Sequence, residues 1–346
     1  MRAQSRKGRG MALLRFLELM RYLTAPLLFF VLFFLTSDSE EVRRPVRASA
    51  IRVHARPITP DRFIIGTAPG LPLSVTGAWH LTSNNPDFGG LSALHVSGGA
   101  LTMVSDKGAL VRLGVDAASQ EWEGTVSPLP SKCGASSQSD NNDTESLVSD
   151  QRTGALWIGF ESRNVICRIA DVAAGGSLAV APKGMADWGA TSGPEAMVRR
   201  RDGSLLVFQE KPVRLGKTGE VIVFSREPTA KGSKSTVMHY RPPSGFLPVD
   251  AAELPDGRLL ILSRRFALPF QFTSRISVVA VDRVQSGKEL KGPIVTRIDD
   301  PRIADNFEGL SVERLDDRLI LWLVSDDNFM KAQRTILLRL EWKMSR

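Results

Sequence analysis

The sequence has few of the side chains that bind transition metals. Its 346 residues include only two cysteines and four histidines. The histidines are His54, His80, His95 and His239. Neither residue type occurs at the ligand spacing of a zinc site. We therefore exclude a thiolate or histidine metal centre.

The sequence also lacks the Gly-x-Ser-x-Gly motif of serine esterases. The segment GATSG, residues 189–193, has Thr191 at its centre and no histidine motif accompanies it, so we interpret it as a turn. A covalent serine mechanism therefore has little support.

Positive charge is concentrated at one end of the chain. Residues 1–60 contain eleven Lys or Arg and four Asp or Glu, a net charge of +7. Residues 61–346 contain 34 basic and 33 acidic residues, a net charge of +1. The main part of the chain therefore has no excess of positive charge for phosphate backbones, and we expect no nucleic-acid partner.

The basic N-terminal segment precedes the apolar run LTAPLLFFVLFFL, residues 23–35. This run suits a secretory hydrophobic region better than a full membrane span, which needs about 20 residues. The basic excess predicts a cytoplasmic N-terminus, and the rest of the chain is expected at the periplasmic or extracytoplasmic face of the membrane. No small-x-small cleavage site follows directly, which favours an uncleaved signal anchor over a cleaved signal peptide. We predict a leader over residues 1–36, a linker over 37–60 and one folded domain over 61–346.

An exported chain reaches an oxidising compartment, where the two cysteines can form a disulfide. Cys133 and Cys167 are the pair. Two separate buried thiols remain the alternative, because the sequence contains no information on their distance.

Internal repetition is the strongest organisational signal. Five similar segments begin at residues 88, 143, 193, 248 and 306. Each has a short apolar strand, a turn and a second apolar strand; two of the turns read RDG and PDG, and helical patterns are almost absent after the leader. Further strand-like runs lie between these hairpins. Four strands per unit of about 50 residues predict an all-β fold, a single β-propeller of five blades, or six if residues 61–87 form one of their own. The N-terminal strands are expected to complete the last blade.

The repeats carry acidic residues at both ends of the hairpin. In a propeller the start of the innermost strand and the end of its partner lie on one face, so we expect these residues to ring one mouth of the central channel. The starts carry Glu145, Glu195, Asp250 and Glu308, and the ends carry Asp106, Glu161, Glu210, Arg264 and Asp326.

So many like charges require compensation by a cation, and oxygen ligands without His or Cys suit Ca²⁺. The predicted metal ligands are the eight acids of this ring. For any one of them, a structural role as a turn former or ion-pair partner is the alternative.

Several motifs together resemble a known family. The segments FGGLSAL, VSDKG, GPEAM, DAAELPDGRLLIL, DNFEGLSV and SDDNF, spread over residues 85–340, are similar to the family named for the esterase-like activity of phytase. The resemblance implies an exported β-propeller, and it suggests hydrolysis of esters or phosphoesters by analogy with propeller phytases that use calcium. The chain departs from the family pattern at Ser146, where a glycine or alanine is frequent, and at Arg264, which replaces an acid.

We therefore expect a Ca²⁺-dependent hydrolase in which metal-activated water attacks a small ester or phosphoester. The candidate catalytic residues are Glu145, Glu195, Asp250 and Glu308, with Arg264 steadying the substrate oxygens. Asp326 is a further candidate ligand or base. The alternative is a non-enzymatic propeller at the membrane surface that binds a ligand or protein through the same acidic mouth and holds calcium for rigidity.

Overall fold

The computed structural model describes residues 44–58, 63, 65–68, 73–133, 143–171, 176–211, 218–268 and 271–343. No helix in this described part is long and apolar enough to cross a membrane. The predicted leader, residues 1–36, lies outside it. The described residues contain β-strands and short 3₁₀ turns but no α-helix, which confirms the predicted all-β class.

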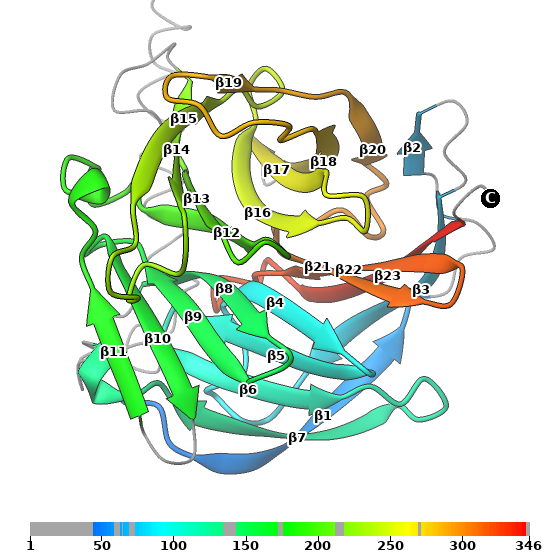
Figure 1. Ribbon diagram of the computed structural model, residues 1–346. Helices are drawn as coiled ribbons and strands as arrows, with labels where there is room; N and C mark the ends of the chain where they lie inside the picture. The colour runs from blue at the N-terminus through cyan, green and yellow to red at the C-terminus, as the bar shows by residue number, and fades with distance from the viewer. Residues whose placement is uncertain are drawn as a thin grey trace, which may run out of the picture.

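Most strands belong to five consecutive antiparallel units (Figure 1). The first three units are β4 (Leu91–Ser97), β5 (Ala100–Ser105), β6 (Ala109–Gly114) and β7 (Glu121–Pro128); β8 (Thr144–Asp150), β9 (Ala155–Phe160), β10 (Val165–Asp171) and β11 (Gly176–Val180); and β12 (Pro194–Arg199), β13 (Leu205–Gln209), β14 (Gly219–Phe224) and β15 (Ser235–Tyr240), which β19 (Glu289–Leu290) extends. The last two are β16 (Leu247–Glu253), β17 (Leu259–Ala267), β18 (Gln271–Val279) and β20 (Ile294–Ile298); and β21 (Phe307–Leu315), β22 (Arg318–Ser325) and β23 (Thr335–Lys343). Two one-turn 3₁₀ helices, η1 (Ser131–Cys133) and η3 (Lys183–Met185), lie between units.

The first strand of each unit lies closest to the centre of the molecule (Figure 1). Strand β4 lies beside β8 and β21, and β12 lies between β8 and β16, while β16 also contacts β21. The five innermost strands therefore follow one another around a central axis. This arrangement is propeller-like.

One N-terminal strand completes the last unit, as predicted. Strand β3 (Leu73–Thr82) pairs with β23, with Trp79 opposite Leu337. Strand β2 (Ile65–Thr67) pairs instead with β20. Residues 61–87 therefore supply strands to two existing units instead of forming a unit of their own.

The predicted linker over residues 37–60 is wrong for its second half. Residues Ser49–Pro57 form strand β1, which pairs with both β3 and β7 and joins the first and last units into one nine-stranded sheet. Alternation explains the strand, since Ile51, Val53 and Ala55 are buried and the residues between them are exposed. The folded part therefore begins at or before Ser49.

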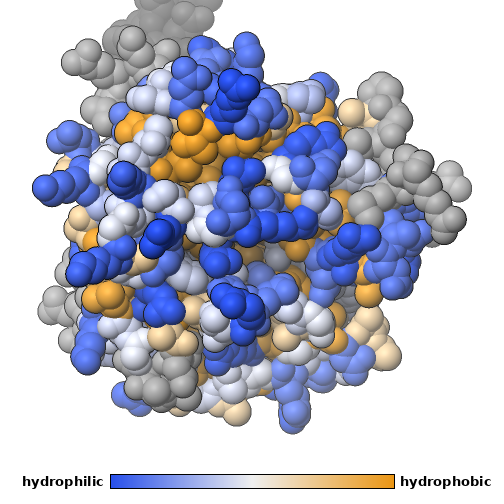
Figure 2. All heavy atoms as spheres, viewed as in Figure 1, coloured by the Kyte–Doolittle hydropathy of each residue, from blue (hydrophilic) through white to orange (hydrophobic). Residues whose placement is uncertain are grey.

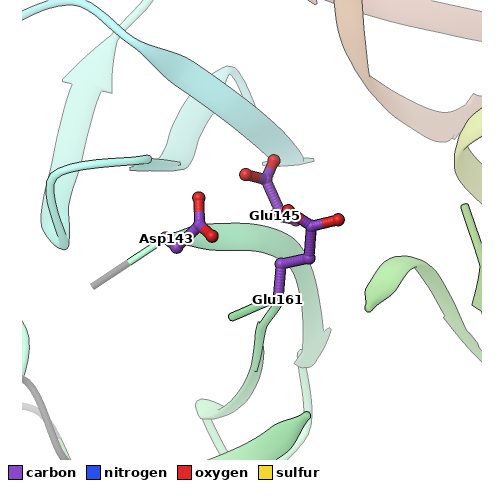
Figure 3. Close-up of side chains that lie close together, drawn as sticks. All are labelled: Asp143, Glu145 and Glu161. Atoms are coloured by element: carbon purple, nitrogen blue, oxygen red, sulfur yellow. The ribbon is translucent and has the colours of Figure 1, made fainter. Parts of the chain in front are cut away.

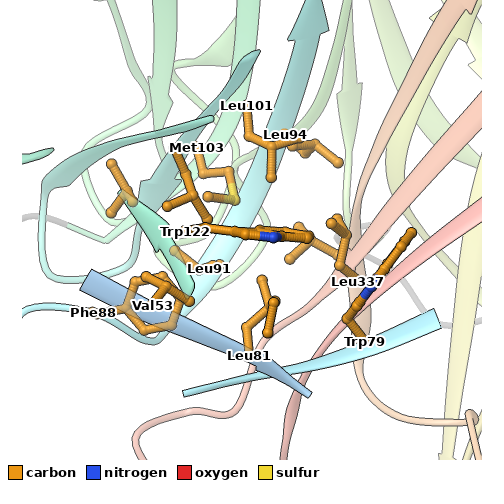
Figure 4. Close-up of a cluster of buried hydrophobic side chains, with 14 of the residues drawn as sticks. Val53, Trp79, Leu81, Phe88, Leu91, Leu94, Leu101, Met103, Trp122 and Leu337 are labelled. Atoms are coloured by element: carbon orange, nitrogen blue, oxygen red, sulfur yellow. The ribbon is translucent and has the colours of Figure 1, made fainter. Parts of the chain in front are cut away.

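Apolar side chains fill the space between neighbouring sheets. In one cluster Trp122 lies at the centre, with Leu94, Leu101 and Leu337 around it (Figure 4). Trp79 packs beside Trp122, with ring centroids 5.6 Å apart. Hydrophilic side chains cover most of the face viewed in Figure 2, apart from a hydrophobic area in its upper part. Burial explains the nearly uniform apolar runs of the second strands, since β13 is buried throughout and β22 is buried after Arg318.

The predicted turns of the hairpins occur where the backbone reverses. Gly203 in RDG has a φ of 86°, and Gly257 in PDG has a φ of 84°. Glycine adopts this left-handed region without steric cost. In the last hairpin Asp316 takes a φ of 55°, a conformation that Asp tolerates better than most residues.

The two cysteines form a disulfide. Cys133 in η1 and Cys167 in β10 are bonded, with Cα atoms 5.3 Å apart. Both are buried. The bond fixes the end of the first unit to the second and settles the question that the sequence left open.

Candidate functional site

Bulges in the innermost strands position three of the predicted glutamates. The register shifts by one residue between Thr144 and Ser146 in β8, and the residue between them is Glu145. The same shift occurs around Glu195 in β12 and Glu308 in β21. A bulge leaves the extra residue unpaired and redirects its side chain. The repeat therefore presents a glutamate at the same place in three units.

The predicted alignment of Asp250 with these three glutamates is wrong by one residue. In β16 the shift falls between Pro248 and Asp250, so Val249 occupies the bulge position. The Asp250 carboxylate accepts hydrogen bonds from the backbone amides of Ala251, at 2.8 Å, and Leu310, at 2.6 Å. Asp250 thus ties β16 to β21. Both carboxylate oxygens of Asp250 therefore accept a hydrogen bond from the backbone, and Asp250 lies outside the set of bulge residues.

The ends of the second strands agree with the predicted alignment. Asp106, Glu161, Glu210 and Asp326 each directly follow the second strand of their unit. The backbone N–H of each of these residues donates to the carbonyl two residues before the bulge residue of the same unit. One example is the hydrogen bond from Asp326 to Asn306, at 2.9 Å. Arg264 takes this position in the fourth unit, opposite Leu247.

These side chains meet as one group, which we call the acidic cluster. Its members are Asp106, Asp143, Glu145, Glu161, Glu195, Glu210, Glu308 and Asp326. Seven of the eight predicted acids belong to it, and Asp250 does not. Asp143 was not predicted as a ligand. The signal in the sequence was the acid-rich segment DNNDTES, residues 140–146.

Arg264 lies among the glutamates of the cluster. Its Nη2 is 3.2 Å from Glu308, 3.7 Å from Glu195 and 3.9 Å from Glu210. Its Nη1 donates to Asn306 at 2.9 Å, and Asn306 donates in turn to Glu308 at 2.8 Å. The guanidinium compensates part of the negative charge of these three glutamates, a role different from the predicted contact with substrate oxygens.

Two sets of three carboxylates have the spacing of metal ligands. Oxygens of Asp143, Glu145 and Glu161 lie within 4.8 Å of one another, and so do those of Glu161, Glu195 and Glu210. Figure 3 shows the carboxyl groups of the first set close together beside the start of β8. Glu161 belongs to both sets. All the donors are carboxylate oxygens, and this donor set fits Ca²⁺, which takes about six to eight oxygen ligands.

Gly193 allows Glu161 to reach this position. A Cβ at Gly193 would lie 2.5 Å from the Cα of Glu161, which no real contact permits. The Gly193 backbone N–H also donates to Glu161 Oε1 at 3.3 Å. The glycine of the GPEAM motif therefore has a physical role in the site.

Burial makes ionisation of the cluster unfavourable. It raises the pKa of Glu145 and of Glu195 well above the usual range, and the negative charges of neighbouring acids add to the effect. Burial and the charge of Asp143 raise the pKa of Glu161 to about 7. Without a cation, several of these carboxyl groups therefore hold protons at neutral pH.

The first and last units contribute the remaining acids. Burial, then the charge of Glu308, raises the pKa of Asp106 to about 8. Asp106 Oδ1 is buried and has no hydrogen-bond partner among the described residues. Burial and the charges of Glu308 and Asp106 likewise raise the pKa of Asp326 well above its usual range. Asp327, which we did not predict, accepts a hydrogen bond from the Gly90 amide at 2.9 Å and fixes the adjoining loop.

The chain matches the family described as "Phytase-like: Esterase-like activity of phytase" over residues 86–329. This match spans more than half of the chain, and the chain therefore belongs to this family. The resemblance seen in the sequence is thus confirmed. A search of curated proteins found no match.

Several solved structures have a similar backbone path. A luciferin-regenerating enzyme is 10% identical, with a TM-score of 0.41, and the match covers 90% of this chain and 97% of the other. Regucalcin from Agrobacterium tumefaciens, described as a calcium-binding protein, is 15% identical, with a TM-score of 0.40 and coverage of 84% and 95%. The Malassezia sympodialis allergen Mala s 1 is 13% identical, with a TM-score of 0.41 and coverage of 83% and 95%. Likeness at this level carries no argument about function.

Proposed function

We propose that this protein is an exported, membrane-anchored hydrolase of small phosphate or carboxylic esters that depends on a divalent cation, with Ca²⁺ the best fit. One observation carries the proposal. The eight carboxyl groups of the acidic cluster lie together, and three described basic groups act on them. Arg264 and Lys211 form ion pairs with glutamates of the cluster, and the charge of Lys107 acts on Asp106. Three positive charges do not balance eight acids, so a divalent cation is the economical partner.

The two carboxylate sets would hold the cation. Bound there, it would supply positive charge for a substrate oxygen and would lower the pKa of a water molecule. Glu161 is shared by the two sets, so its carboxylate would hold the cation in either of them. Glu145, Glu195, Glu308 and Asp326 are ligands or bases in this proposal, and Arg264 keeps the glutamates in place. Asp250 has no catalytic role.

The location also belongs to the proposal. The leader predicts export and membrane attachment, with the folded part outside the cytoplasm. The Cys133–Cys167 disulfide supports this, since such bonds persist in oxidising compartments. We also assign the five antiparallel units as the blades of a five-bladed propeller, because their innermost strands contact one another in order around the axis.

A non-enzymatic propeller that binds a ligand or a protein is the second candidate. The position of Arg264 favours it, because a guanidinium beside three glutamates resembles a structural ion-pair network more than a substrate clamp. In that case calcium would stiffen the channel without supporting turnover.

Turnover separates the two candidates. The full-length protein would be assayed with p-nitrophenyl phosphate and p-nitrophenyl acetate, in Ca²⁺ and in excess EDTA. A hydrolase loses turnover in EDTA and in Glu161→Gln, while Glu123→Gln, at an exposed position of β7, keeps it. Calcium binding without turnover of either ester would favour the non-enzymatic candidate.

A further inference from the structure

A cavity lies between the five innermost strands, away from the acidic cluster. Its volume is about 430 Å³, and residues of all five innermost strands line it. Along β12 the cluster residue is Glu195, near the start of the strand, whereas the cavity is lined by residues 197–201, from the middle of the strand into the following turn. Along β16 the corresponding lining residues are 251–253, the end of that strand. The cavity therefore lies at the other end of the innermost strands from the acidic cluster.

Arginines dominate the charge of this cavity. Four arginines and two acids line it, which gives a net formal charge of +2. They are Arg152, Arg199, Arg200, Arg201, Asp150 and Glu253. The two ends of the channel thus carry opposite charge. A concave site with excess positive charge attracts anions.

The two acids orient the arginines without using all of their donors. Arg199 Nη2 is 3.4 Å from Asp150. Arg200 Nε is 3.4 Å from Glu253, and a single carboxylate of Glu253 also pairs with Arg201 at 3.9 Å. Arg200 additionally pairs with Asp202 outside the cavity, at 3.4 Å. The guanidinium of Arg199 also lies over the Trp157 ring, 5.6 Å from its centroid, which leaves its Nε and Nη1 without an ion pair among the described residues.

Two buried polar atoms beside the cavity have no hydrogen-bond partner in the described part of the chain. They are Nε of Arg199 and Nε2 of His95. Burial lowers the pKa of His95, so its ring is neutral at physiological pH. Buried polar groups without partners are rare in proteins, and a cavity that contains them points to a missing ligand.

The rest of the lining includes apolar residues, although the lining surface as a whole is more polar than apolar. Leu94, Leu147, Met197, Ala251 and Leu310 are among them, one from each innermost strand. Convergent charged groups orient a bound small molecule, and apolar side chains contact its body. We propose that this cavity binds a small organic anion, a carboxylate or phosphate group on an apolar body, with Arg199 and its neighbouring arginines contacting the anionic group.

Binding to the full-length protein would be measured by calorimetry in excess EDTA, so that calcium at the acidic cluster has no part in the result. The probes are benzoate and phenylphosphonate, which separate the two anionic groups, and benzamide, a neutral analogue of benzoate. We expect saturable binding of at least one anion and at least tenfold weaker binding of benzamide. Arg199→Lys should weaken the anion at least tenfold while keeping a positive charge beside Asp150, because Lys lacks the planar donor fork.

The control variant is Arg112→Gln, at an exposed position of β6, which should bind like the wild type. If Arg199→Lys does not fold, the exposed Arg152→Gln replaces it and should also weaken binding. The absence of saturable binding by both anions, or equal binding of benzamide, would overturn the proposal, and so would wild-type affinity in the folded arginine variant. None of these results depends on the hydrolase proposal, which the ester assay tests separately.

Discussion

Replacing Asp106 by asparagine should make the calcium-free protein more stable at alkaline pH. The pKa of Asp106 in the folded protein is about 8, because burial and the charge of Glu308 oppose ionisation. In the unfolded chain it is about 3.9. The folded state therefore holds a proton that the unfolded state releases, and the stability associated with this proton is lost as the pH rises towards 8.

The size of the effect follows from these two pKa values. Between these two pKa values, each pH unit lowers the free energy of unfolding by about 1.4 kcal/mol, and the loss levels off near pH 8. The free energy of unfolding of the wild type should therefore fall by roughly 2 kcal/mol between pH 6 and pH 8 through Asp106. Asparagine is neutral at both pH values and loses nothing. The stability of Asp106→Asn relative to the wild type should therefore rise by roughly 2 kcal/mol over this range, or about 4 °C in Tm.

The assay is urea unfolding of the full-length proteins in excess EDTA at pH 6 and pH 8. Comparing variants at each pH removes the contribution of His80 and His95, whose lowered pKa values have the opposite sign. Asp202→Asn is the matched control. Burial would raise the pKa of Asp202, but its hydrogen bonds with Ser204 and the charge of Arg200 lower the pKa below its usual value. The contribution of Asp202 to the free energy of unfolding is therefore constant above pH 6. A difference between Asp106→Asn and the wild type that does not change with pH would refute the reasoning.

Three further changes test other parts of the structure. Arg264→Gln should destabilise the calcium-free protein by about 3–5 kcal/mol at pH 8 in urea unfolding, because buried glutamates lose their partner; a loss below about 1 kcal/mol would contradict this. Replacing Cys133 and Cys167 together by serine should cost about 3–4 kcal/mol by the chain-entropy relation, and unchanged thermal unfolding would argue against a structural role for the bond. Gly193→Ala should weaken calcium binding at least tenfold in calorimetry by displacing Glu161, and wild-type affinity would show that this close approach is unimportant to the metal.

Repetition in the sequence was sufficient to predict the β-hairpins and most of the acidic cluster. The turns at Gly203 and Gly257 and the strand-end acids follow a period that is visible in the residues alone. The alignment failed at Asp250, because a bulge adds one residue to each innermost strand and the sequence does not mark which residue that is.

Other features depend on contacts between distant segments. Residues 49–57 were predicted to be part of a linker, because arginines and prolines recur over residues 43–60. The buried face of β1 nevertheless has the alternation of a strand. Partners far along the chain, β3 and β7, decide its structure. The involvement of Asp143 likewise depends on how Glu161 from the next strand folds back towards it.

The measurement that tests the central claim most directly is a calorimetric titration of Ca²⁺ into the EDTA-treated, dialysed full-length protein. Deleting residues up to 56 would remove most of β1, so the whole chain is needed. We predict saturable binding in the wild type and in Glu123→Gln, and binding at least tenfold weaker in Glu161→Gln, which removes the carboxylate shared by both ligand sets. Absence of binding in the wild type, or equal affinity in folded Glu161→Gln, would contradict the assignment of the acidic cluster as a calcium site.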